Sequence, residues 1–266
     1  MLDASMVVPD GRALAYSECG APGGVPIMYC HGGPGSRLDL VWFDRTFADL
    51  GVRVIAADRP GYGGSTPQPG RTWNDWPTDV AALGDHLGLD RFAVMGLSSG
   101  GPYAVACASL LAERVTGAAV IAGVTDMGWT GAWDAYDEAE ATLMRFGDDE
   151  RALTWCQDRY GPNGERFFDD TGEMPPADLA LLEDEAVVAG LFPTFAEAFR
   201  PGIAGFAHDI TVQGRPWSFD PGAITAPTRV FHGEVDTMCP SPMVATPPRS
   251  YPTPPSRPSP TTATSA

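Results

Sequence analysis

The chain contains 266 residues, and its 34 acidic and 17 basic residues give a formal net charge of −17 at pH 7. A surface this acidic repels phosphate groups, so the charge argues against nucleic acids and against anionic membrane surfaces as partners. Hydrophobic residues make up 44% of the chain, which is enough for a packed core. No apolar run reaches the ~20 residues that a membrane-spanning helix needs.

The five cysteines are widely spaced, odd in number and never form a CxxC pair. This pattern argues against a disulfide framework and against a zinc site, and reduced thiols fit a cytoplasmic protein. The first residues, Met1 to Ala4, lack the basic and apolar regions of a signal peptide. We therefore expect a cytoplasmic protein that holds no metal and no cofactor.

Short apolar runs alternate with amphipathic stretches over the first half of the chain. The expected strands are 2–8, 11–18, 25–30, 52–57, 92–97 and 115–122, and the expected helices are 37–50, 73–88 and 99–111. From the third strand onward these runs are apolar throughout, as strands buried on both faces are. The order of elements predicts an α/β fold with a mostly parallel, doubly wound sheet, whose first part spans residues 1–124.

The sequence changes character after Gly123. Residues 125–205 are rich in acidic and aromatic side chains, and helical periodicity predicts an inserted helical segment with helices at 134–146, 150–160 and 177–191. The sheet is expected to continue within 206–243, with a strand at 227–231. Residues 244–266 are rich in Pro, Ser and Thr and have no periodic apolar pattern, so we expect a disordered tail.

The pentapeptide from Gly96 to Gly100 matches G-x-S-x-G and lies between an expected strand and an expected helix. A nucleophile elbow needs this context, with small residues two positions before and after the serine. The register selects Ser98, because a nucleophile at Ser99 would put Leu97 where the motif needs Gly. The helix N-terminus beside Ser98 favours a developing oxyanion. The alternative is that Ser98 only caps the helix.

A glycine-rich segment, HGGPG, follows the third expected strand. Glycines leave backbone N–H groups open to a substrate, so the N–H groups of Gly33 and Ser99 are the candidate oxyanion donors. The alternative is a glycine-rich turn without a catalytic part. His31, which opens this segment, is expected to hold the loop together rather than to transfer protons.

Two further segments follow strands. Asp58 opens DRPGYGGS, and we interpret this segment as a tight turn in which Asp58 accepts backbone hydrogen bonds. Asp236 lies just beyond the strand at 227–231, at the carboxyl edge where open α/β sheets build their sites. A carboxylate there can hold an imidazole in the right tautomer and stabilise its charged form. Glu234 is the competing acid.

Four motifs in this order, around a helical insertion, resemble the α/β-hydrolase superfamily, and most closely its bacterial esterase and aminopeptidase-like group. The motifs are HGGPGS, DRPGYGGS, GLSSGG and HGEVD. The resemblance covers residues 1–243 and implies that 125–205 form a cap. It also implies a nucleophile at Ser98, an acid at Asp236 and a later His as base, acting on a small carboxylic ester or a related acyl bond. A prolyl aminopeptidase remains open, whereas dehalogenases and epoxide hydrolases carry Asp where this chain has Ser98.

The chain departs from this pattern in its histidines. All four of them precede Asp236, namely His31, His86, His208 and His232. His208 could face the cleft, and His232 belongs to a motif that the family carries beside its separate base. The last helix–strand–helix of the fold is also expected to be missing, through a shifted reading frame near 239–245 or as a natural variant. The sequence thus predicts an impaired serine hydrolase, or alternatively a noncatalytic pseudoenzyme that binds a small acyl ligand.

Overall fold

The computed structural model describes residues 2–129, 131–136, 138–169, 176–234, 236 and 239. They contain a seven-stranded sheet of order β1-β2-β4-β3-β5-β6-β7, in which β1, β2 and β4 pair antiparallel and the other neighbours pair parallel. The strands are β1 Leu2–Val7, β2 Ala13–Gly20, β3 Val25–Cys30, β4 Val52–Ala57, β5 Phe92–Leu97, β6 Val115–Ile121 and β7 Thr228–Phe231. The expected α/β fold with a mostly parallel, doubly wound sheet is confirmed.

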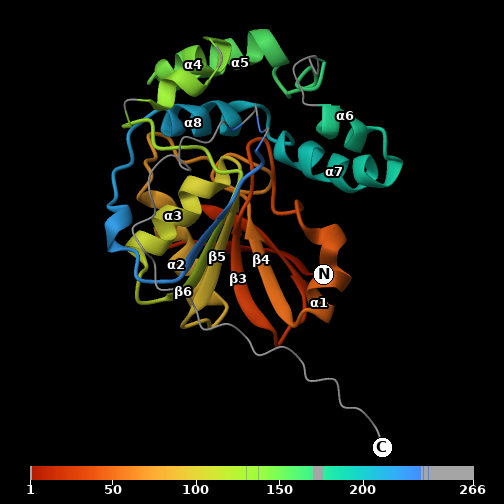
Figure 1. Ribbon diagram of the computed structural model, residues 1–266, viewed down its shortest axis with the longest axis vertical. Helices are drawn as coiled ribbons and strands as arrows, with labels where there is room; N and C mark the ends of the chain where they lie inside the picture. Colours follow the sequence, from red (N-terminus) through yellow and green to blue (C-terminus); the bar gives the residue numbers. More distant parts are fainter. Residues whose placement is uncertain are drawn as a thin grey trace, which may run out of the picture.

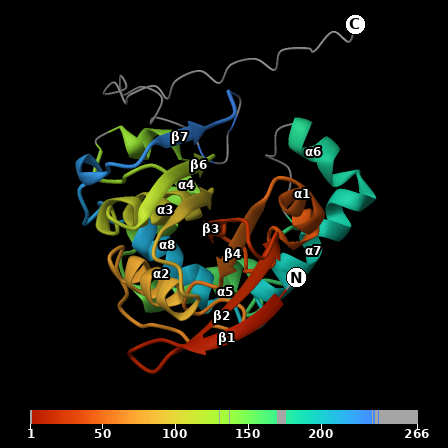
Figure 2. The ribbon, with the colours of Figure 1, turned by 90° about the horizontal axis from the view of Figure 1, so that it is seen from below.

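Helices cover both faces of the sheet. Helices α2 (Asp75–His86) and α3 (Gly100–Leu110) lie on one side, and α1 (Asp44–Asp49) lies on the other (Figure 2). The main hydrophobic core forms between the sheet and the first pair, and includes Leu83 and Tyr103. Apolar faces on both sides explain why the central strands are apolar throughout.

The helix expected at 37–50 forms only in its second half, as the short 3-10 helix η1 (Val41–Phe43) followed by α1. The reason is a turn in which the Asp39 carboxylate accepts the backbone N–H of Ser36 at 3.0 Å and the hydroxyl of Tyr29 at 3.0 Å. Because Asp39 satisfies backbone groups outside a helix, the helical pattern cannot extend through it.

The second half of the chain adds helices at the end of the sheet where the parallel strands finish (Figure 1). They are η2 Ala132–Ala135, α4 Glu138–Arg145, α5 Asp149–Tyr160, α6 Pro176–Leu182, α7 Glu185–Ala198 and α8 Ala204–Gln213. The short 3-10 helix η3 (Pro221–Ala223) instead packs against α3, just before β7 begins. Helix α8 lies between the sheet and the pair α4 and α5 (Figure 1). None of the described helices is long and apolar enough to cross a membrane.

Two helix predictions need correction here. The stretch 177–191 is not one helix, because α6 ends at Leu182 and α7 begins at Glu185 and continues to Ala198. Asp184 causes the restart, since its carboxylate accepts the backbone N–H of Val187 at 3.4 Å as an N-cap does. The stretch 134–146 is likewise divided, because Tyr136 is extended between η2 and α4. Helix α8 was not predicted at all.

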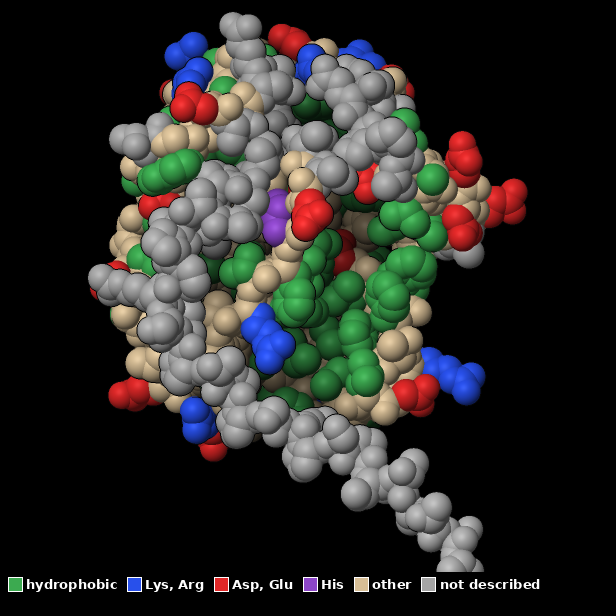
Figure 3. All heavy atoms as spheres, in the orientation of Figure 1, with side chains coloured by type: hydrophobic (Ala, Val, Ile, Leu, Met, Phe, Trp, Pro, Cys, Tyr) green, Lys and Arg blue, Asp and Glu red, His purple; other side chains and the backbone are tan. Residues whose placement is uncertain are grey.

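Other expectations concern the end of the chain. The disordered tail at 244–266 and the missing last helix–strand–helix both fall outside the described residues. Within those that are described, β7 is the last strand of the sheet, and it exposes 47% of Val230 and 51% of Phe231. Figure 3 shows hydrophobic side chains gathered on one face of the molecule, over the part of the view where β3 and β4 lie in Figure 1.

Candidate active site

Ser98 lies in a sharp turn between β5 and α3. Its φ of 52° places it in the left-handed region, which a serine adopts only at a cost in conformational energy. The turn is held by hydrogen bonds from the Ser98 N–H to the Ile121 carbonyl and from the Gly101 N–H to the Ser98 carbonyl, both at 2.9 Å. Backbone strain of this kind is typical of functional sites.

The two glycines of the motif are required by close packing. A β-carbon at Gly96 would clash with the carbonyl oxygen of Gly100, and one at Gly100 would clash with the carbonyl oxygen of Cys30 at the end of β3. Strand β5, helix α3 and strand β3 therefore approach one another too closely for any side chain at these positions. The G-x-S-x-G pattern records this geometry, and the strained residue is Ser98 rather than Ser99.

The glycine loop after β3 lies against the elbow. A β-carbon at Gly33 would lie 2.6 Å from the Ser99 Oγ, so the two predicted oxyanion donors come from adjacent backbone segments. Within the described part of the chain, neither the Gly33 N–H nor the Ser99 N–H donates a hydrogen bond to a backbone or side-chain acceptor. Free N–H groups at the start of a helix and in an adjacent loop can bind an oxyanion.

His31 is buried beneath this loop and both of its ring nitrogens are engaged. Nδ1 donates to the Gly32 carbonyl at 2.7 Å, and Nε2 accepts the backbone N–H of Arg59 at 3.0 Å. Burial, reinforced by the charge of Arg59, holds the pKa of His31 well below its ordinary value. A neutral imidazole with two fixed partners holds the loop together, as the sequence indicated, and has no lone pair left for Ser98.

The turn after β4 carries Asp58 and Arg59 side by side in sequence. Asp58 accepts the backbone N–H groups of Arg37 at 2.7 Å and Gly64 at 2.8 Å, as expected for a turn. Arg59 forms a buried ion pair with Asp209 of α8, with Nη2 2.6 Å from Oδ2. The sequence analysis did not single out Asp209.

Asp209 is the centre of a buried polar cluster. It accepts the Arg71 guanidinium at 2.7 Å, the Tyr103 hydroxyl at 2.7 Å and the Tyr62 hydroxyl at 3.1 Å. Burial alone would raise the pKa of Asp209. The charges of Arg59 and Arg71 outweigh this effect, so the pKa lies well below its ordinary value. A permanently ionised carboxylate therefore connects α8 to the turn after β4.

Asp236, the predicted acid, lies beside His232 just beyond β7. The His232 Nε2 is 3.3 Å from the Asp236 Oδ2 and 2.7 Å from the Cys239 carbonyl oxygen. Both of these oxygens are acceptors, so Nε2 carries the proton. The other Asp236 oxygen accepts the Cys239 N–H at 2.8 Å. The competing acid, Glu234, is exposed.

Cys239 connects this segment to the elbow. Its Sγ is 3.5 Å from the Ser98 Oγ, which brings the predicted nucleophile and the predicted acid into one region. The sequence analysis missed both the His232–Asp236 pair and the position of Cys239. The sequence shows the four-residue spacing of His232 and Asp236, but outside a helix this spacing does not predict that the two side chains are in contact.

Unlike Cys239, His208 and His86 have no described hydrogen bond to Ser98. His208 is half-buried on α8, where burial lowers its pKa and the charge of Asp149 on α5 opposes the shift. Among the described contacts there is no hydrogen bond between His208 and Ser98. His86 is exposed on α2, with its Nε2 3.5 Å from the Tyr16 hydroxyl.

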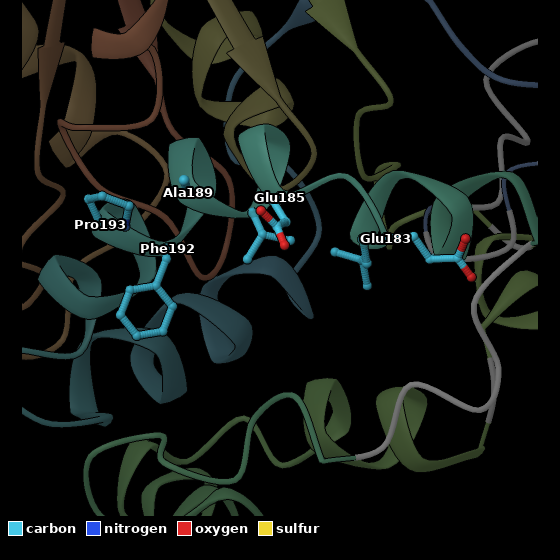
Figure 4. A pocket seen from close by; sticks show the side chains of 7 residues that line it. Glu183, Glu185, Ala189, Phe192 and Pro193 are labelled. Atoms are coloured by element: carbon cyan, nitrogen blue, oxygen red, sulfur yellow. The ribbon is translucent and has the colours of Figure 1, made fainter.

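A hollow with a volume of about 490 Å³ lies along α6 and α7. Figure 4 shows Phe192 and Glu185 projecting from α7 at this hollow. Its lining consists of Leu182, Glu183, Glu185, Val188, Ala189, Phe192 and Pro193. It contains none of the motif residues, so the candidate site rests on the elbow rather than on this hollow.

Comparisons with known proteins agree with the observed fold. The family model described as alpha/beta hydrolase fold matches residues 25–162. A proline iminopeptidase from Xanthomonas citri is 37% identical over 110 residues, covering 40% of this chain and 34% of that protein. A non-heme chloroperoxidase from Streptomyces lividans is 36% identical over 100 residues, covering 36% of each chain. The matches thus span about a third of the length of these curated relatives.

Among solved structures, a thermophilic esterase from Thermogutta terrifontis is similar over a larger part of the chain. It is 25% identical with a TM-score of 0.64, and the match covers 90% of this chain and 83% of the esterase.

Proposed function

The chain belongs to the α/β-hydrolase fold family, and from that premise we propose that it is a serine hydrolase directed at a small carboxylic ester or a related acyl bond. The observation that carries this proposal is the left-handed backbone of Ser98 in its strand–turn–helix context. In the proposed reaction the Ser98 Oγ attacks the acyl carbon. The N–H groups of Gly33 and Ser99 stabilise the oxyanion that forms.

The proposed cap consists of 125–205, with the core in 1–124 and 206–243. Helices α4 and α5 lie beyond α8 as seen from the sheet (Figure 1), which supports a role in covering the acyl site. The similarity to an esterase structure and to an iminopeptidase supports small esters or peptides as substrates.

We further propose that the chain is a poor hydrolase, because no hydrogen bond among the described residues joins an imidazole to the Ser98 Oγ. A serine hydroxyl attacks slowly unless a base removes its proton. The proton on the His232 Nε2 faces Asp236 and Cys239, and the group 3.5 Å from the Ser98 Oγ is a thiol. In an unrelated serine protease, loss of the base lowers turnover by about 10⁶-fold.

The test is turnover of p-nitrophenyl acetate by the purified full chain, together with labelling of Ser98 by a fluorophosphonate. We expect slow labelling that disappears in Ser98→Ala, and a turnover number far below about 1 s⁻¹, the low end for ordinary enzymes. Labelling that persists in Ser98→Ala would refute the nucleophile. Ser98-dependent turnover above about 1 s⁻¹ would instead refute the absence of a base, and His232→Gln and His208→Gln would then identify it.

A second candidate function is a noncatalytic protein that binds a small acyl ligand. The position of the Cys239 thiol beside the Ser98 hydroxyl favours it, because a thiol then occupies space next to the nucleophile. Calorimetry with short-chain carboxylates and acyl amides separates the two functions. Binding without Ser98 labelling favours the second candidate, and labelling of Ser98 favours the first. A prolyl p-nitroanilide in the same assay tests the iminopeptidase alternative.

A further inference from the structure

Arg59 is fully buried at the end of β4 and binds both backbone segments that meet at the candidate oxyanion site. Its Nη2 donates to the Gly32 carbonyl at 2.9 Å and approaches the Ser99 Oγ at 3.3 Å. Its Nη1 donates to the carbonyl of His31. One guanidinium therefore contacts the glycine loop after β3 and the elbow after β5.

The contact with Gly32 fixes the direction of the next N–H group. The bond between Gly32 and Gly33 is a planar trans peptide, in which the C=O and the following N–H point in opposite directions. Because the Gly32 carbonyl points toward Arg59, the Gly33 N–H points away from it. That N–H group is the proposed oxyanion donor, so its direction depends on the guanidinium together with the His31 Nδ1–H, which donates to the same carbonyl.

The guanidinium is itself held rigidly. Asp209 accepts both its Nε at 2.8 Å and its Nη2 at 2.6 Å. The guanidinium carbon Cζ of Arg59 lies 5.4 Å from the ring centre of Tyr62 and 4.8 Å from that of Tyr103. Both distances are within the range of favourable cation–π contacts. A fixed planar group with several donors can set the direction of a peptide, whereas a flexible ammonium cannot.

We propose that Arg59 is a positioning residue for oxyanion stabilisation, acting through the Gly32–Gly33 peptide and Ser99. This inference rests on the proposed function, because it concerns the same oxyanion site. A positioning role predicts a loss in the chemical step at Ser98 and no loss in the initial binding of a neutral reagent.

Substitution of Arg59 leaves a balanced cluster. Two guanidinium groups share Asp209 in the native chain, and in Arg59→Met the carboxylate keeps Arg71 and the hydroxyl of Tyr103. Arg59→Lys retains the positive charge but cannot reach Gly32, Ser99 and Asp209 together. Arg114→Met is the matched control, because Arg114 also lies over an aromatic ring and donates to backbone carbonyls. It lies beside the start of β5, whereas Ser98 follows the end of that strand.

The experiment measures fluorophosphonate labelling of Ser98 in the full chain as a function of reagent concentration. This separates the reversible binding constant KI from the maximal labelling rate kinact. We expect Arg59→Met to lower kinact about 10-fold or more, a part of the ~10²–10³ that follows loss of an oxyanion donor. KI should stay within about twofold, Arg59→Lys should fall between Arg59→Met and the native chain, and Arg114→Met should match the native chain.

Near-UV circular dichroism reports whether each variant is folded. If the native chain labels at Ser98 and folded Arg59→Met has the same kinact, the inference is wrong. If Arg59→Met does not fold, Arg59→Lys decides: an unchanged kinact overturns the inference, and a reduced kinact with unchanged KI supports it. If the native chain itself is not labelled at Ser98, the proposed function fails, which is a separate and recognisable result.

Discussion

The segments after β3, β4 and β5 and the segment after β7 meet at Ser98, but they are held in different ways. Arg59 and Asp209 connect the segments after β3, β4 and β5 at the carboxyl end of the sheet, through buried hydrogen bonds between charged groups. Asp236 lies in the segment after β7, a strand that exposes Phe231, and its described side-chain contacts are with His232 and Cys239. In the acid half of the site, the described contacts of the Asp236 carboxylate are thus local, whereas in the nucleophile half those of Arg59 join segments that are far apart in the sequence.

The same substitution in each half gives the largest expected contrast. Asp209→Asn leaves two buried guanidinium groups without a charged partner and should lower the free energy of unfolding by about 3–5 kcal/mol. Asp236→Asn weakens a largely buried contact, with side chains 7% and 17% exposed, but leaves no guanidinium without its carboxylate, and should cost about 1 kcal/mol. Urea unfolding followed by circular dichroism measures both. Equal losses would contradict the contrast between the two halves.

The pH dependence of stability should show the burial of His31. In the unfolded chain the imidazole takes up a proton near its ordinary pKa of 6.5, whereas the folded pKa is well below that value. The stability contribution of the neutral form is therefore present above pH 6.5 and is lost as the pH falls below it. The slope contributed by His31 approaches about 1.4 kcal/mol per pH unit.

His31→Gln should flatten the dependence of the unfolding free energy on pH between about 6 and 5. His86→Gln is the control, because it removes an exposed imidazole on α2 and leaves the loop around His31 unchanged. His208 contributes in the same direction as His31, since its pKa is also lowered. An identical slope in the native chain and in His31→Gln would show that the loop does not keep this imidazole neutral.

The strain at Ser98 should make glycine more stabilising than alanine at this position, the reverse of their order inside a helix. Ser98→Gly should be more stable than Ser98→Ala by about 1 kcal/mol, because only glycine adopts the left-handed region without cost. At Ser109, inside α3, the order should be the opposite by a similar amount. Thermal unfolding of the four variants provides the comparison. The same sign at both positions would mean that the elbow is not strained in solution.

The smallest effect is expected at Cys239, where the two halves touch. Cys239→Ala removes a buried thiol from the Ser98 hydroxyl and should lower the unfolding free energy by about 0.5 kcal/mol. Cys107→Ala, in the main core, should cost about 1 kcal/mol through the cavity that it leaves. A loss at Cys239 as large as that at Cys107 would show that the segment after β7 is held as firmly as the core.

The sequence predicted the sheet and the elbow because both are encoded by local patterns. Apolar runs marked the strands, and the glycines at 96 and 100 marked a packing constraint that the structure confirms. Helix α8 was missed because most of its residues are buried, on the sides facing both the sheet and α5. A helix buried on both sides shows no apolar stripe with the 3.6-residue period.

The partners of the candidate site were harder to predict than its motifs. Asp209 and Arg59 are 150 residues apart in the sequence, and no local pattern predicts that they form a pair. His232 and Asp236 are close in sequence, but their contact depends on the course of the chain after β7. Roles assigned to Ser98 and Asp236 remain predictions that the experiments above address.

The long separation of Arg59 and Asp209 has a consequence for synthesis of the chain. Every backbone group proposed for the oxyanion site is present once residue 101 has left the ribosome, but the counterion of Arg59 follows more than a hundred residues later. Until α8 emerges, the guanidinium groups of Arg59 and Arg71 have no Asp209 carboxylate to neutralise them, and burying them is unfavourable. We therefore expect Arg59 and the carboxyl end of the nascent sheet to stay exposed to water until α8 has been translated.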